Sequence, residues 1–167
     1  MKVVVADTSP LNYLILIDCV ELLRDLYTRI VIPTVVLDEL SAVGAPPQVI
    51  HWVWSRPAWV EVRSAPGGGC FPNEIDASAL DAGEAAAIRL ALSEPDSLLL
   101  IDETAGRSVA TRLGVANTGT LGVLLAGAKE GLIDLRSSLT RLQQTNFRIS
   151  KGLVDAILVQ AQQPNGS

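Results

Sequence analysis

Short apolar runs alternate with longer amphipathic stretches along most of this chain. Val3–Ala6 and residues 98–101 are apolar at every position, which is typical of strands buried on both faces of a sheet. The run 29–32 is short and mainly apolar, 115–118 is short and begins with two apolar residues, and 60–63 alternates apolar with charged residues. The pattern predicts strands at 3–6, 29–32, 60–63, 98–101 and 115–118, with a brief extended segment at 147–149.

Helices are predicted between and after these strands. The expected helices are 11–17, 21–26, a helix whose first turn holds Pro33 and which runs to Leu40, then 48–55, 79–92, 104–113, 119–130, 135–143 and 153–162. Strands that alternate with helices favour a parallel sheet covered on both sides. We therefore predict an α/β fold, a three-layer α/β/α sandwich with a mainly parallel central sheet. No linker divides the chain, so we expect a single domain over 1–163 and a frayed tail at 164–167.

Several acidic residues occupy positions where such a sheet places its ligands, beyond the carboxyl ends of the strands. Asp7 and Asp102 end two of the apolar runs, and Thr118 ends a third. Glu39 comes from the helix that follows the second strand. Asp81 and Glu84 are three residues apart near a helix start, so they share a face there. The positive end of that helix would help to keep them ionised.

Each of these acids also has an ordinary interpretation. Asp7 and Asp102 could cap helices, Asp81 and Glu84 could be first-turn acids, and Glu39 could be a solvated helix residue. Together, however, they would repel one another, and lysine is scarce: the chain holds only Lys2, Lys129 and Lys151. A hard divalent cation with oxygen ligands, Mg²⁺ or Mn²⁺, would relieve this repulsion.

Composition excludes several other classes of protein. The net charge of −5 argues against a broad basic face that grips duplex DNA, and an aromatic content of 4% argues against a base-stacking platform. Cys19 and Cys70 lack the spacing of zinc ligands, which favours reduced thiols in a cytoplasmic protein. No apolar stretch reaches the roughly 18 residues that a membrane span requires, so we expect no membrane association.

Four segments, in order, resemble the PIN domain family. They are VADTSPL at 5–11, VLDEL at 36–40, LDAGEAAAI at 80–88 and LIDETAGR at 100–107. They are most similar to the bacterial and archaeal PIN-like branch that carries Leu-Asp-x-Gly-Glu-Ala-x-Ala-Ile and Asp-Asp-x-x-Gly-Arg motifs. The stretch NTGTLG at 117–122 also matches.

The resemblance implies a role for each matching residue. The core metal-binding and catalytic acids would be Asp7, Glu39, Glu84 and Asp102, with Asp81 as an accessory. Thr8 or Ser9, and also Thr118, would hydrogen-bond a carboxylate or a metal-bound water. Glu103 departs from the pattern, because the family has a second Asp there, and its role as a ligand stays open. Arg107 could pair with an active-site carboxylate or meet a substrate phosphate.

The implied activity is that of a metal-dependent ribonuclease, often the toxin of a VapBC-type toxin–antitoxin pair. Water activated by Mg²⁺ or Mn²⁺ would attack a phosphodiester bond of single-stranded or structured RNA. A small antitoxin protein and a second copy of the chain are the expected partners. No histidine nucleophile is needed, and the sole histidine, His51, is interpreted as a surface or packing residue.

Other interpretations fit less well or remain open. A haloacid-dehalogenase-type phosphatase needs a second acid where Ser9 stands, and a response-regulator receiver needs a lysine near Thr118. The stronger alternative is a catalytically weak PIN-like module that binds nucleic acid or a partner. The bulky apolar residues of 11–17 and the Trp52, Trp54 and Trp59 group could belong to the core or to a docking surface.

Overall fold

The computed structural model describes residues 2–67, 71–72 and 75–164. Within these residues a five-stranded sheet has the order β3-β2-β1-β4-β5, and each neighbouring pair is parallel. The strands are β1 (Val3–Ala6), β2 (Ile30–Pro33), β3 (Val60–Arg63), β4 (Ser97–Leu100) and β5 (Ala116–Thr118). The predicted α/β fold is confirmed. The 147–149 segment is not part of the sheet.

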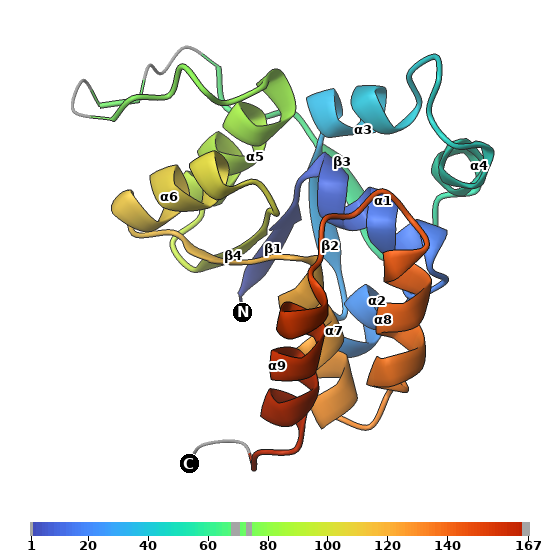
Figure 1. Cartoon of the computed structure of the whole chain (residues 1–167). Coiled ribbons are helices and arrows are strands. Elements are labelled where there is room, and N and C mark those ends of the chain that lie inside the picture. The colour runs from blue at the N-terminus through green and yellow to red at the C-terminus, as the bar shows by residue number, and fades with distance from the viewer. Residues whose placement is uncertain (1, 68–70, 73–74, 165–167) are drawn as a thin grey trace.

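Helices cover both faces of the sheet and make the outer layers of the sandwich (Figure 1). On one face, α5 (Ala82–Leu92) and α6 (Thr104–Arg112) enclose a core that includes Val5 and Leu99. On the other face, α1 (Thr8–Leu16), α2 (Leu22–Tyr27) and α7 (Thr120–Lys129) pack over Val4 and Leu100. Successive strand residues point to opposite faces, so uniformly apolar strands supply both cores.

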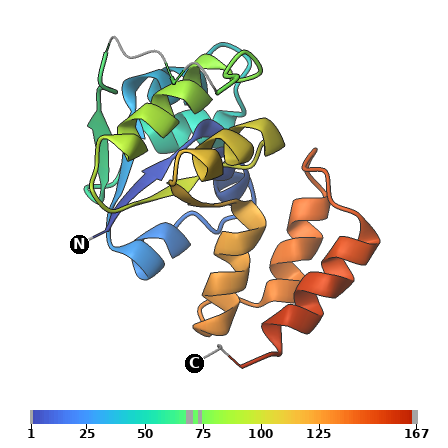
Figure 2. The ribbon, with the colours of Figure 1, turned by 90° about the vertical axis from the view of Figure 1, so that its left-hand side faces the viewer.

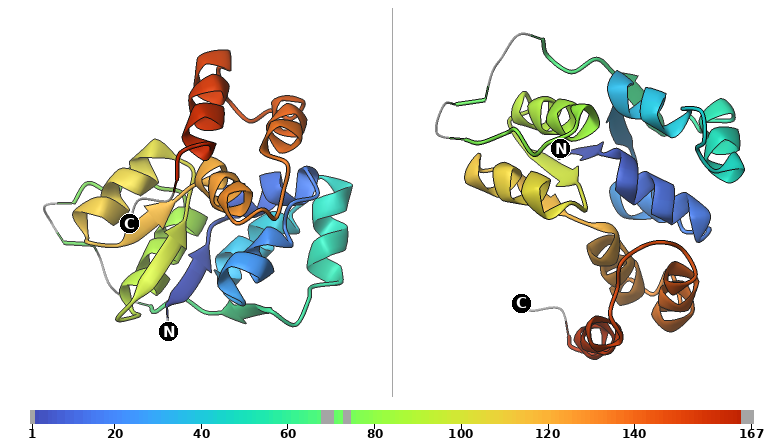
Figure 3. Two further views of the ribbon diagram at one scale, coloured as in Figure 1. Left: turned by 90° about the horizontal axis from the view of Figure 1, so that it is seen from below. Right: turned by 45° about the horizontal axis from the view of Figure 1, so that its top comes forward.

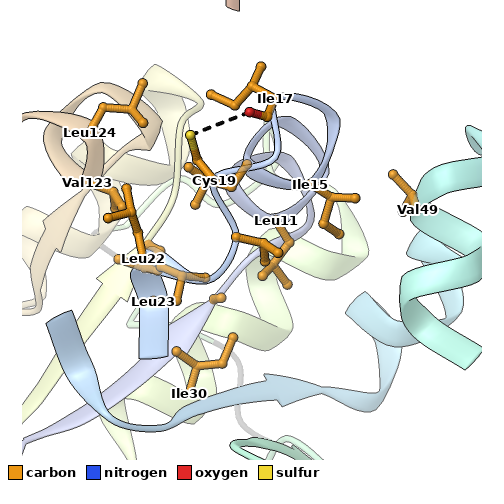
Figure 4. Packing of buried hydrophobic residues seen from close by; sticks show 14 of the residues in the cluster. Leu11, Ile15, Ile17, Cys19, Leu22, Leu23, Ile30, Val49, Val123 and Leu124 are labelled. Atoms are coloured by element: carbon orange, nitrogen blue, oxygen red, sulfur yellow. Dashed lines mark hydrogen bonds between the residues drawn. The ribbon is translucent and has the colours of Figure 1, made fainter. Parts of the chain in front are cut away.

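The larger core is built around α1. Leu11, Leu14 and Ile17 are fully buried there, and Leu22 and Leu23 pack from α2 (Figure 4). The bulky apolar residues of 11–17 thus serve the core rather than a docking surface. Cys19 is a buried free thiol in the same cluster, and its Sγ lies 3.5 Å from the Ile17 carbonyl oxygen.

The remaining helices extend the sandwich at two places. α3 (Thr34–Leu40) and α4 (Pro47–Trp54) lie between β2 and β3 in the chain. α8 (Leu135–Gln143) and α9 (Lys151–Ala161) pack on α7 and on each other, on the side of α7 away from the sheet (Figures 2 and 3). Among the described helices, none is long and apolar enough to span a membrane.

Several predicted boundaries need correction, and two of them lie where an aspartate occupies the N-cap position. α1 begins at Thr8 rather than at residue 11, and α5 begins at Ala82 rather than at residue 79, because Asp7 and Asp81 take the extended N-cap conformation. Pro33 is the last residue of β2 and precedes α3, with φ −63° and ψ 149°, instead of sitting in the helix. Cys70 and the tail beyond Pro164 lie outside the described residues.

Candidate functional site

The carboxyl ends of β1 and β4 bring Asp7 and Asp102 to the same edge of the sheet. The Asp7 amide donates to the Leu100 carbonyl oxygen at 2.9 Å, and the Ile101 amide donates to that of Thr118 at 2.8 Å. These bonds continue the ladder past the ends of the strands. Asp7 is 3% exposed, although its side chain is a carboxylate.

Glu39 reaches this edge from α3 and joins the first turns of two other helices. Its Oε2 accepts a hydrogen bond from the Thr8 hydroxyl, and its Oε1 accepts one from the Gly83 amide at 3.0 Å. A Cβ at residue 83 would lie 2.6 Å from Oε1, so the carboxylate occupies the space that glycine leaves free. Glu39 therefore ties α3 to α1 and α5.

Asp81 and Glu84 stand at the start of α5, as the sequence predicts. The Glu84 amide donates to Asp81 Oδ1 at 2.8 Å, which caps the helix. The Glu84 side chain is 5% exposed and extends toward α6, where an added Cβ on Gly106 would lie 3.5 Å from its Oε2. Asp81 itself is exposed, so the two acids have different environments.

Asp102 is held by the N-terminus of α7. Its Oδ1 accepts from the Thr120 amide at 2.7 Å, and its Oδ2 accepts from the Thr120 hydroxyl at 2.8 Å. The sequence predicts such a hydrogen bond from Thr118, whereas in the structure it comes from Thr120. The available signal is the position of Thr120, which follows Gly119 at the start of a helix after a strand. Gly119 leaves room for Asp102, because a Cβ there would lie 2.6 Å from Oδ1.

A family comparison agrees with this geometry. The family model DUF3368, which describes a PIN domain, matches residues 3–163. The chain belongs to the PIN domain family. No curated protein and no solved structure matches it significantly. PIN domains are generally nucleases, which bind nucleic acids and typically use divalent metals.

Burial changes the ionisation of acids at this edge of the PIN domain. Desolvation, together with the nearby charges of Asp81, Glu39 and Asp102, raises the pKa of Asp7 from 3.8 to about 7, although the Thr8 backbone amide acts in the opposite direction. Desolvation also raises the pKa of Glu84 from 4.5 to about 8, with contributions from Asp81 and Asp7. At Glu84, burial in the metal-free protein therefore acts against the ionised form that the helix end favours.

The pKa of Asp102 is also raised from its ordinary value of 3.8, mainly by desolvation. The two hydrogen bonds from Thr120 and the nearby charge of Arg107 favour its charged form and limit the rise. The charge of Asp102 acts on Asp7 and the charge of Asp7 acts on Glu84, so Asp7 links the other two acids electrostatically.

Two carboxylate oxygens in the cluster are buried and have no hydrogen-bond partner among the described residues: Asp7 Oδ1 and Glu84 Oε2. A buried carboxylate without a partner is costly, so these atoms fit a group that supplies positive charge. Oxygen donors of this kind suit Mg²⁺ or Mn²⁺. In the described part of the chain, no three Asp, Glu, His or Cys side chains form a ready ligand set as they stand. Side-chain adjustment would have to complete one.

The other predicted site residues lie at the rim of the PIN domain cluster. Glu103 is exposed before α6, and its charge raises the pKa values of Glu84 and Asp102. Arg107 is exposed, and its Nε donates to Asn117 Oδ1 at 3.4 Å. Ser9 and Thr118 are half-buried and donate to no carboxylate in the described residues. His51 is exposed on α4.

Proposed function

We propose that this PIN domain is a metal-dependent endoribonuclease that uses Mg²⁺ or Mn²⁺. The observation that carries the proposal is the pair of buried, unpartnered carboxylate oxygens of Asp7 and Glu84 at the carboxyl edge of the sheet. A structural cap or a surface acid would not need such burial. Membership of the PIN domain family supports nuclease activity in general. We propose RNA as the substrate.

The chain offers four acids to hold the metal: Asp7, Glu39, Glu84 and Asp102. Asp81 stands beside Glu84 as an accessory, and Glu103 at the rim could enter the ligand set only by moving its longer side chain inward. When bound, a divalent ion lowers the pKa of water and stabilises the leaving oxygen of the phosphodiester. Thr8 and Gly83 orient Glu39, and Thr120 orients Asp102, so two of the four carboxylates are already held in place.

The test is cleavage of a defined panel of RNAs, with and without Mn²⁺, by the wild type and single-site variants. Asp7→Asn and Asp102→Asn should abolish Mn²⁺-dependent cleavage while the proteins stay folded by circular dichroism. Asp38→Asn is the matched control, because Asp38 is an exposed acid next to Glu39 on α3, and this variant should cleave as the wild type does. Full activity in purified Asp7→Asn would contradict the proposal.

The alternative is a binding module with a weak or absent metal site. Calorimetric titration of the metal-free protein with Mn²⁺ separates the two functions. An intact site should bind Mn²⁺ in the wild type and lose that binding in Asp7→Asn. If the wild type binds RNA but takes up no Mn²⁺ and cleaves nothing, the binding module is the correct description.

We further propose a cytoplasmic toxin that is restrained by a small antitoxin and forms a homodimer. Trp54, 83% exposed at the end of α4, supports a protein partner, whereas Trp52, two residues earlier, packs against Trp59. Expression in bacteria should arrest growth, and Asp7→Asn should relieve the arrest. Sedimentation should give a dimer that Trp54→Ser weakens. Normal growth with an active enzyme would contradict the toxin role.

A further inference from the structure

A hollow of about 510 Å³ opens beside Asp102. One side is formed by the starts of α6 and α7, which supply Thr104, Arg107 and Gly119. The other side is formed by α9 and by the connection that precedes it, with Phe147 and Arg148. The hollow thus lies between the edge of the sheet that carries Asp102 and the C-terminal helices. On this side, a substrate would reach the acidic site through the hollow.

Tyr13 of α1 fixes the connection that forms the far wall. Its hydroxyl donates to Asn146 Oδ1 at 2.8 Å, and its ring meets Phe147 edge-on, with centroids 4.9 Å apart at 86°. Desolvation raises the pKa of Tyr13, and the charges of Asp102 and Glu103 add to the rise, so the tyrosine lies near the acidic edge. The connection between α8 and α9 accordingly passes close to α1 (Figure 1).

The chemistry of the hollow is divided between cationic and apolar groups. Arg107 and Arg148 come from different walls, are exposed, and take part in none of the ion pairs of the described residues. Thr104, Thr118 and Gln160 add polar atoms. Phe147 and the leucines of α7 and α9 supply apolar surface. Guanidinium groups pair well with phosphate, and apolar and aromatic groups contact unpaired bases.

We infer that this hollow is a subsite for one nucleotide of single-stranded RNA, next to the phosphate that is cleaved. A backbone phosphate lies between Arg107 and Arg148, and the base packs on the side of Phe147. The inference rests on the proposed nuclease function and names its substrate as unpaired RNA, because a paired base cannot turn its face to this wall. A second hollow of about 390 Å³ shares Thr104 and Arg107, so the strand can continue across α6.

Fluorescence anisotropy tests the subsite. It measures the binding of a fluorescein-labelled single-stranded oligoribonucleotide to the Asp7→Asn protein, which should not cleave it. Arg148→Ala should weaken binding roughly fivefold and reduce the slope of log K against log salt by about 0.7. Arg148→Lys should retain more of the affinity than alanine does. Arg141→Ala is the control, because Arg141 is an exposed arginine of α8 that does not line the hollow, and it should leave binding unchanged.

In the active protein, Arg148→Ala should raise KM for the same RNA more than it lowers kcat. Unchanged affinity in Arg148→Ala, or equal Arg148-dependent binding of a duplex of the same sequence, would overturn the subsite. The subsite would also be overturned if Arg148→Ala bound RNA as the wild type does but no longer bound a protein partner. If binding depends on Arg148 but the wild type never cleaves RNA, the nuclease proposal fails and the subsite stands. If the wild type cleaves RNA and Arg148→Ala cleaves it equally well, the subsite fails and the nuclease proposal stands.

Discussion

Gly83 and Gly119 lie where the carboxylates of Glu39 and Asp102 come close to the backbone. Gly83 leaves space for Glu39, and Gly119 leaves space for Asp102. Neither glycine has the positive φ that usually explains a required glycine. Their importance is instead the missing Cβ, which lets a backbone amide at or next to the glycine donate to the acid. At the scale of single residues, the site is shaped as much by these absent side chains as by the acids.

Gly83→Ala should therefore displace Glu39 and reduce the affinity for Mn²⁺, by roughly 10- to 100-fold as for other groups that orient a ligand. Helix stability should hardly suffer, since alanine is the better helix former. The control is Gly152→Ala, at the second position of α9 as Gly83 is at the second position of α5, where an added Cβ meets nothing within 4 Å. Calorimetry measures both affinities. Equal affinities for Mn²⁺ in the two variants would show that metal binding does not depend on the close contact between the Glu39 carboxylate and the backbone at Gly83.

At the scale of elements, apolar and alternating runs predict the five strands to within one residue, and the clearest is β1, which is apolar throughout as expected of a strand buried on both faces. Asp7 and Asp102 follow from the strand ends. The start of α5 is less predictable, since residues 79 and 80 have helical composition but precede the Asp81 cap. The local pattern places Thr120 at a helix start but does not pair it with Asp102, because the two residues are 18 positions apart in the chain. Glu39 was identified largely through the family motif.

The two hydrogen bonds that Thr120 at the start of α7 donates to Asp102 lead to a prediction for Thr120→Val. This substitution removes the hydroxyl bond but keeps the shape of the side chain and the backbone bond. Because Thr120 is fully buried and its acceptor is a carboxylate, we expect a loss of about 1.5–3 kcal/mol in the free energy of unfolding. Urea unfolding measures it. Thr140→Val, at an exposed position of α8, should change stability by less than about 0.5 kcal/mol. A similar loss of unfolding free energy in both variants would show that the hydrogen bond from the Thr120 hydroxyl to Asp102 does not stabilise the fold.

At the scale of the whole molecule, the charge of −5 does not describe an evenly acidic surface. The site proposed here gathers Asp7, Glu39, Asp81, Glu84, Asp102 and Glu103, which together exceed the net excess. The remaining residues are near neutral, and most of the basic ones are arginine. A bound divalent ion would offset much of the local charge. The composition therefore opposes a broad grip on duplex DNA, but not a small contact with one RNA strand.

The same cluster should make global stability depend on pH and metal together. The pKa values of Asp7 and Glu84 are raised to about 7 and about 8, so between about pH 4 and those values the folded protein holds protons that the unfolded chain has lost. Their contribution is fully present below about pH 4. The free energy of unfolding of the metal-free protein should then fall as pH rises from 5 to 8, by up to roughly 1.4 kcal/mol per pH unit for each group.

Urea unfolding at pH 5 and pH 8, with and without Mn²⁺, measures this coupling. Asp7→Asn should raise the stability of the metal-free protein at pH 8 more than at pH 5, because it removes a buried group that must ionise. Mn²⁺ should stabilise the wild type, by about 2.7 kcal/mol at one hundred times Kd. At one fixed Mn²⁺ concentration the gain should be larger at pH 8, since at pH 5 the ion competes with protons and binds more weakly. Asp7→Asn should gain little from Mn²⁺. A wild type that becomes more stable from pH 5 to pH 8 without metal, with Asp7→Asn following the same curve, would show that Asp7 does not titrate as a buried acid.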